Sequence, residues 1–269
     1  LDSVTSNDYT FLRPHHELVM AHPDPNVFSQ WQPTLALATG SGELLDGLVA
    51  RLAPPSEARL NWRNALSKEE ASFRDASDIQ VYGDVNMAQV LAHFRAHVPS
   101  NSIMVSDAGT FGRWLHRFYA FTQPDTCLGP VSGAMGYGVP GGIGACLGGE
   151  GRPVFTFVGD GGFLMAGQEA ATVVQEQLPL KIIVCDNNAW GSIVVSAQKR
   201  FPGMEYGTRL VSPDFETLAK GYGMTAVSVR TTDEFPAALE TMMATDGPAL
   251  MHIHLDVRDV SPFKEQPAG

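Results

Sequence analysis

The feature that most constrains the fold is a pair of apolar, β-forming runs separated by a helix-forming segment. The runs cover residues 154–158 and 180–185, and the segment between them, residues 166–178, ends before a proline. Short β-branched runs bounded by turn residues are typical of buried parallel strands. The sequence therefore predicts a right-handed strand–helix–strand unit, which brings the carboxyl ends of both strands to one edge of a sheet.

A polar cluster follows each of these runs. Gly-Asp-Gly-Gly occupies residues 159–162, and Asp-Asn-Asn occupies residues 186–188. Mg²⁺ prefers hard oxygen ligands such as carboxylate and amide oxygens, while glycines let the backbone approach an anion closely. Either cluster alone is typical of a tight turn or a strand-end cap. The two together, on one strand–helix–strand unit, predict a site for a divalent cation and a diphosphate.

At these residues the chain resembles the thiamine diphosphate (ThDP) enzymes, and within them the acetolactate synthase-like branch. The signature of these enzymes is Gly-Asp-Gly followed, some two dozen residues later, by Asn-Asn. The resemblance implies that the side chains of Asp160 and Asn187 and the carbonyl of Ala189 hold Mg²⁺. It also implies that Gly161 and Gly162 lie against the diphosphate of ThDP.

The register of the asparagine pair has two readings. Asn187 lies 27 residues after Asp160 and four residues before Gly191, and both spacings suit the metal ligand of this branch. Asp186 then takes the place of the first asparagine of the signature. The alternative register uses Asn188 and the carbonyl of Trp190 instead.

A second stretch, residues 132–144, resembles the segment that holds the aminopyrimidine ring in these enzymes. The resemblance implies that the carbonyl of Gly133 accepts from the exocyclic amine and that the N–H of Met135 donates to a ring nitrogen. The Met135 side chain would wedge the cofactor into its bent form, and a thioether is adaptable enough for that. Residues 136–141 also match the dinucleotide pattern Gly-x-Gly-x-x-Gly, but no apolar strand leads into them, so nicotinamide binding is disfavoured.

Two further segments resemble parts of the same site. Residues 107–118 are similar to the other diphosphate-contacting loop, where the backbone N–H groups of Thr110 and Phe111 would face phosphate oxygens. The segment that begins at Trp190 is similar to the one that covers the active site. Trp190 and Ile193 are therefore expected to line a substrate pocket, although burial in a core would explain both residues nearly as well.

Composition places the chain among ordinary soluble globular proteins. Of its 269 residues, 44% are hydrophobic and 17% are charged, and the formal net charge is −11. The acidic balance and the lack of a basic run argue against nucleic-acid binding, and no apolar run is long enough to span a membrane. Three cysteines, Cys127, Cys146 and Cys185, fit no metal or redox spacing and predict a reducing, cytoplasmic location with buried thiols.

The predicted fold class is α/β, with a doubly wound, mainly parallel sheet that has helices on both faces. Residues 83–269 are predicted to form this ThDP diphosphate-binding domain, including a helix that has Pro213 at its first position. Residues 1–55 resemble the C-terminal remnant of a Rossmann-like central domain. Residues 56–82 are predicted to be a charged linker between the two.

The resemblance implies a ThDP- and Mg²⁺-dependent enzyme that decarboxylates a 2-oxo acid, with or without ligation of the product to a second carbonyl compound. No residue matches the activating glutamate of the pyrimidine-binding domain, so that domain is expected from a second subunit of a homodimer or homotetramer. The isolated chain is expected to be inactive. The alternatives are a lyase for 2-hydroxyacyl-CoA or oxalyl-CoA and a non-catalytic relative, and FAD binding is left open.

Overall fold

The computed structural model describes residue 10 and residues 15–204 and 206–263. The chain divides into two compact units, Leu1–Leu66 and Ser67–Gly269. Among the described residues, no helix is both long and apolar enough to cross a membrane. The boundaries predicted from sequence, at residues 55 and 82, remain predictions.

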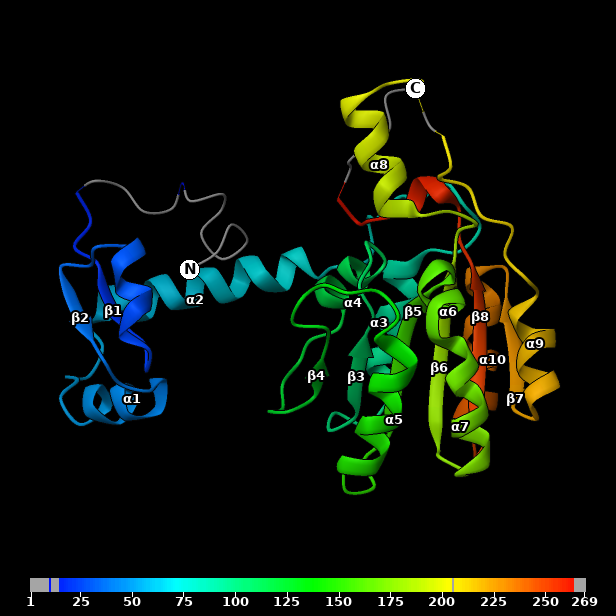
Figure 1. Cartoon of the computed structure of the whole chain (residues 1–269), viewed down its shortest axis with the longest axis horizontal. Helices are drawn as coiled ribbons and strands as arrows, with labels where there is room; N and C mark the ends of the chain where they lie inside the picture. The colour runs from blue at the N-terminus through cyan, green and yellow to red at the C-terminus, as the bar shows by residue number, and fades with distance from the viewer. Residues whose placement is uncertain (1–9, 11–14, 205, 264–269) are drawn as a thin grey trace. The chain divides into compact units, whose positions relative to one another are not determined.

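The second unit is built on a six-stranded sheet in which every pair of neighbouring strands is parallel. The order of its strands is β4-β3-β5-β6-β8-β7 (Figure 1). Their bounds are β3 Ile103–Ser106, β4 Cys127–Leu128, β5 Val154–Gly159, β6 Leu180–Asp186, β7 Thr225–Val229 and β8 Ala249–His254. The predicted doubly wound α/β fold is therefore confirmed.

Helices cover both faces of this sheet, because side chains alternate between faces along each strand. On β5, Phe155 and Phe157 face one core, and Val154 and Val158 face the other. The first core is closed by α3 (Met87–His97), α4 (Gly112–Phe118) and α10 (Phe235–Met243). The second is closed by α5 (Gly138–Gly148), α6 (Asp160–Ala166), α7 (Ala170–Gln175) and α9 (Phe215–Tyr222).

The chain changes direction across the sheet between β3 and β5. The connection after β3 runs through α4 to β4 on one side, whereas the connection after β5 runs through α6 and α7 to β6 on the other. In open α/β sheets such a switch point leaves a crevice outside the carboxyl ends of the strands. The loops after β3 and β5 therefore border the same crevice.

Three details differ from the sequence-based expectations. The crossover helix starts at Asp160, directly after the strand, and is divided into α6 and α7 by a 3-10 turn at Gly167–Glu169. Pro213 precedes α9 instead of opening it, because the Asp214 side chain caps this helix by accepting from the N–H of Thr217 at 3.0 Å. The thiol of Cys127 is exposed, so only Cys185 fits the prediction of full burial.

The first unit contains a two-stranded parallel sheet and a helix. Strand β1 (Val19–Ala21) pairs with β2 (Leu35–Leu37), and α1 (Ser41–Val49) follows. Helix α2 (Glu57–Phe73) contains the boundary between the two units.

Candidate functional site

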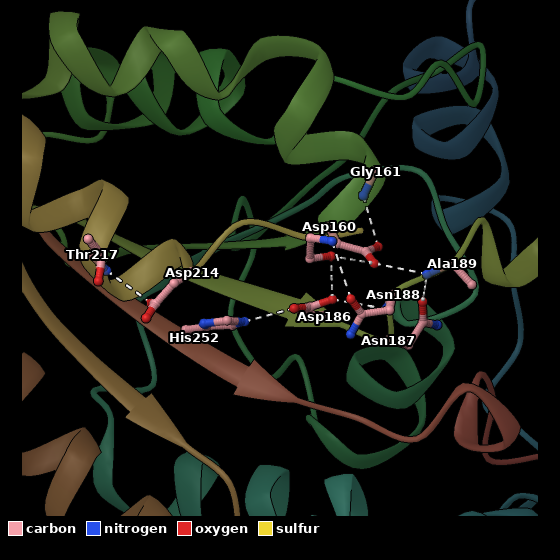
Figure 2. Close-up of polar contacts among 10 residues, drawn as sticks. Asp160, Gly161, Asp186, Asn187, Asn188, Ala189, Asp214, Thr217 and His252 are labelled. Atoms are coloured by element: carbon pink, nitrogen blue, oxygen red, sulfur yellow. Dashed lines mark hydrogen bonds and ion pairs between the residues drawn. The ribbon is translucent and has the colours of Figure 1, made fainter. Parts of the chain in front are cut away.

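The two polar clusters lie together at the carboxyl edge of the sheet, because β5 and β6 are paired in register up to Gly159 and Cys185. Asp160 opens α6 and is only 3% exposed. Its Oδ1 accepts from the N–H of Gly161 at 2.8 Å, and its Oδ2 accepts from the N–H of Ala189 at 3.1 Å. Figure 2 shows this carboxylate with its contacts to Gly161 and Ala189.

The two asparagines face different partners. Asn187 Oδ1 accepts from the N–H of Ala189 at 3.1 Å, so it converges with Asp160 Oδ2 on the same backbone group (Figure 2). Asn188 has a φ of 54°, and its Oδ1 accepts from the N–H of Ser212 at 3.2 Å. The geometry therefore favours Asn187 over Asn188 as the side chain that could join Asp160 at a metal ion.

A second buried carboxylate, that of Asp186, is hydrogen-bonded to residues beside this cluster. Its Oδ2 lies 2.9 Å from Nε2 of His252 on β8, and its Oδ1 accepts from the N–H of Asn188 at 2.9 Å. The hydroxyl of Ser212 donates to Asp186 Oδ1 at 2.8 Å and lies 3.4 Å from Asp160 Oδ2. The two carboxylates are thus joined through one hydroxyl.

The environments of the two carboxylates push their pKa values in opposite directions. Burial raises the pKa of Asp160 to about 6, and the neighbouring Asp186 adds to the effect. Burial also acts on Asp186, but hydrogen bonds from His252, the Asn188 N–H and Ser212 outweigh it and lower its pKa. A divalent cation beside Asp160 would favour the charged form of this carboxyl, which suits a metal ligand.

One cleft is lined by nearly all of the site residues that the sequence predicts. Its empty space measures about 530 Å³, including the open solvent at its mouth. The predicted residues that line it are Thr110, Phe111, Met135, Asp160, Gly161, Gly162, Asn187, Ala189, Trp190 and Ile193. Gly133 does not line the cleft. Its φ of 68° is a backbone conformation that residues other than glycine rarely adopt.

Asp107 is a supporting residue of the cleft that the sequence did not single out. It is 3% exposed, and its carboxylate accepts from the N–H groups of Ala108 at 2.8 Å, Gly136 at 3.0 Å and Tyr137 at 3.1 Å. These bonds tie the loop after β3 to the segment that contains Met135. A sequence signal existed, since Asp107 follows a buried strand directly, but its partners lie 29 and 30 residues away.

The glycines after Asp160 are required by their surroundings. A Cβ at Gly161 would lie 2.3 Å from the Trp190 ring, and a Cβ at Gly162 would lie 2.3 Å from Asp107 Oδ2. Both distances are far shorter than a van der Waals contact. The absence of side chains lets α6 begin against Trp190 and Asp107, with its first N–H groups close to the cleft.

We expect Gly162→Ala to lower the free energy of unfolding by about 1–3 kcal/mol. The new methyl group must displace the Asp107 carboxylate from the N–H groups of Gly136 and Tyr137. Urea unfolding measures this difference. Gly144→Ala on α5 is the matched control, since nothing lies within 4 Å of a Cβ there. Equal stability of the two variants would show that Asp107 is not held in place by this packing.

The donor set at the edge of the sheet fits a hydrated divalent cation with a bound diphosphate. A carboxylate from Asp160, an amide oxygen from Asn187 and the carbonyl of Ala189 are the share that a protein usually gives to Mg²⁺, which keeps its other positions for water and phosphate. All three residues line the cleft. The apolar side chains of Met135, Trp190 and Ile193 line it too and could contact an organic cofactor or substrate.

The comparisons with known proteins agree on the family. Residues 107–253 match the thiamine pyrophosphate enzyme, C-terminal TPP binding domain. The chain is 30% identical over 260 residues to acetolactate synthase isozyme 2 large subunit of Escherichia coli (strain K12), which covers 95% of this chain and 46% of that protein. It is 34% identical over 240 residues to acetolactate synthase 1, chloroplastic, of Zea mays, covering 82% of this chain and 37% of that protein.

A solved structure shares the fold. The thiamine diphosphate-dependent 4-hydroxybenzoylformate decarboxylase of Rhodococcus jostii RHA1 superposes with a TM-score of 0.75 at 22% sequence identity, over 91% of this chain and 45% of that chain. The chain thus spans about half the length of the E. coli relative and of this structure. With the domain match over residues 107–253, these similarities show that the chain belongs to the thiamine pyrophosphate enzymes and carries their C-terminal TPP binding domain.

Proposed function

We propose that this chain supplies the diphosphate- and metal-binding half of a ThDP-dependent enzyme that decarboxylates a 2-oxo acid. The observation that carries the proposal is the convergence of Asp160 Oδ2 and Asn187 Oδ1 on the N–H of Ala189 in a cleft beside Met135. Oxygen ligands and an apolar wall in one cleft suit a cofactor with a charged diphosphate and an apolar ring system.

The residues divide into four roles in this proposal. Asp160, Asn187 and the carbonyl of Ala189 would hold Mg²⁺. Backbone N–H groups would face the diphosphate, and these belong to Thr110, Phe111, Gly161 and Gly162. Gly133 and Met135 would hold the aminopyrimidine ring, and Trp190 and Ile193 would contact the substrate. Bound ThDP would supply the electron sink for loss of carbon dioxide.

The similarity to acetolactate synthases supports ligation of the decarboxylated product to a second carbonyl compound as part of the activity. Because the chain spans about half the length of these relatives, we also propose that a pyrimidine-binding domain, from a second subunit, completes the site. Residues 1–55 would then be the end of a central domain and residues 56–82 the linker to the ThDP-binding domain. The assembly would be a homodimer or homotetramer.

Release of carbon dioxide from 2-oxo acids tests this function. Pyruvate and 2-oxobutyrate are incubated with the chain, ThDP and Mg²⁺, with and without an added pyrimidine-binding domain from an acetolactate synthase. We expect turnover only when the domain is present. Turnover by the chain alone would contradict the need for a partner domain, and its absence for every 2-oxo acid offered to the complemented protein would contradict the proposed function.

A further inference from the structure

A second cavity adjoins the cofactor cleft. Its empty space measures about 930 Å³ including open solvent, against about 530 Å³ for the cleft. It shares Thr110 and Ser192 with the cleft, so the two spaces adjoin at these residues. The remaining polar lining comes from the start of α4 and from α8 (Gly191–Arg200), through Arg113, Ser196, Lys199 and Arg200.

The charge of this cavity is opposite to that of the chain. Three cationic side chains line it, and no acidic residue is found among the described residues of its wall. The chain as a whole has a formal net charge of −11. A concentration of positive charge in one concave surface of an acidic protein attracts anions to that place.

Helix α8 runs from the cofactor cleft along the wall of the cavity, since its first turn lines the cleft and its later turns line the cavity. Ser192, Ser196 and Lys199 are four and three residues apart and therefore lie on one face of the helix. Ile193, in the first turn of α8, lines the cofactor cleft. With a rise of 1.5 Å per residue, Lys199 lies roughly 10 Å along the helix from Ser192. A substrate that reacts in the cleft can therefore extend along α8 toward the cations.

Arg113 approaches the same space from another element. It follows Thr110 by three residues at the start of α4, which precedes α8 by more than 70 residues in the sequence. Guanidinium groups bind carboxylates and phosphates in a fixed, two-pronged geometry, and lysine adds a mobile point charge. Hydroxyl groups of Ser192 and Ser196 add donors between them.

We propose that the cavity is a subsite for an anionic group at the far end of the substrate. The inference rests on the proposed function, and it narrows the substrate class to 2-oxo acids whose side chain ends in a carboxylate or a phosphate. The cleft receives the 2-oxo acid end, and Lys199 and Arg200 receive the distal anion. A substrate with a cationic side chain is repelled at the same place.

Matched substrates test the subsite in the complemented protein with ThDP and Mg²⁺. 2-Oxoglutarate and 2-oxopentanoate have the same five-carbon chain, but the first ends in a carboxylate and the second in a methyl group. We expect kcat/KM to favour 2-oxoglutarate by roughly tenfold or more, and the preference to decrease as salt is added. 2-Oxoadipate and 2-oxohexanoate repeat the comparison with one more methylene.

The variant Lys199→Gln/Arg200→Gln is expected to remove most of this preference by raising KM for 2-oxoglutarate, with little effect on 2-oxopentanoate. Arg95→Gln, on α3 and outside the cavity, is the control and should change neither substrate. Inhibition by free coenzyme A that the double variant abolishes would assign the distal anion to a phosphate. An unchanged preference in the double variant, or equal use of the two acids by the wild-type protein, would overturn the proposal.

Failure of the subsite can be distinguished from failure of the proposed function. If 2-oxopentanoate is decarboxylated and 2-oxoglutarate has no advantage, the function stands and the subsite does not. If no 2-oxo acid is decarboxylated, binding still tests the subsite, with intrinsic tryptophan fluorescence as the readout during titration with glutarate and, separately, with pentanoate. Binding of glutarate that is no tighter than that of pentanoate would then refute it.

Discussion

Asp160→Asn is expected to weaken Mg²⁺-dependent binding of ThDP by more than about 100-fold, because even residues that only support metal ligands change affinity by 10–100-fold. The substitution removes the negative charge but keeps one oxygen, which can accept from the N–H of Gly161 or from that of Ala189, since these two groups bond to different oxygens of Asp160. Calorimetric titration of ThDP at fixed Mg²⁺ measures the loss. Asp233→Asn, at an exposed helix start, is the control and should bind as the wild type does.

The weaker ThDP binding of Asp160→Asn is not expected to come from unfolding of the variant. The pKa of Asp160 is raised from 3.8 to about 6 in the folded chain, so the stability that its protonated form contributes at low pH is lost as the pH rises through about 6. Above that pH the buried charge destabilises the cofactor-free fold, and asparagine removes it. The melting temperature of Asp160→Asn at pH 7 is therefore expected to equal or exceed that of the wild type, while a clear decrease would contradict this view of the site.

His252→Ala is expected to lower the free energy of unfolding by about 3 kcal/mol, because it leaves the Asp186 carboxylate buried without its strongest partner. The two side chains are 2% and 3% exposed and lie 2.9 Å apart. An ionised carboxylate only accepts, so Nε2 of His252 carries the proton between them. Denaturant unfolding in the absence of cofactor measures the loss.

The same variant is expected to weaken Mg²⁺-dependent ThDP binding by about 10–100-fold, since Asp186 holds the N–H of Asn188 and thereby the loop that contains Asn187. His252→Gln places an amide donor near the carboxylate and should restore most of the affinity. His97→Ala, at an exposed position on α3, is the control. Equal affinity in His252→Ala and the wild type would show that Asp186 does not position the metal site.

The sheet, and the edge of it at which the site lies, could be predicted from the sequence. The runs at residues 154–158 and 180–185 became β5 and β6 with nearly the predicted bounds, because each is short, apolar and followed by turn residues. The polar residues after β5 and β6 then had to meet, since parallel strands end at one edge. Local pattern and chain direction together fixed this part of the site.

Contacts between segments far apart in the chain could not be predicted from the sequence. The pairing of Asp186 with His252 spans 66 residues, and the bonds from Asp107 span 29 and 30. No periodicity or spacing rule brings such residues together. The cationic cavity is of the same kind, because Arg113 and Lys199 lie on separate helices and neither stands in a basic run.

Equilibrium binding of ThDP to the chain, with Mg²⁺ and with EDTA in its place, shows whether the Asp160 cluster holds the diphosphate through a metal ion. The site described here predicts saturable binding that requires the divalent cation and is lost in Asp160→Asn but retained in Asp233→Asn. Binding that is equally tight in EDTA, or that survives in Asp160→Asn, would contradict the assignment of Asp160 and its neighbours as the metal and diphosphate site.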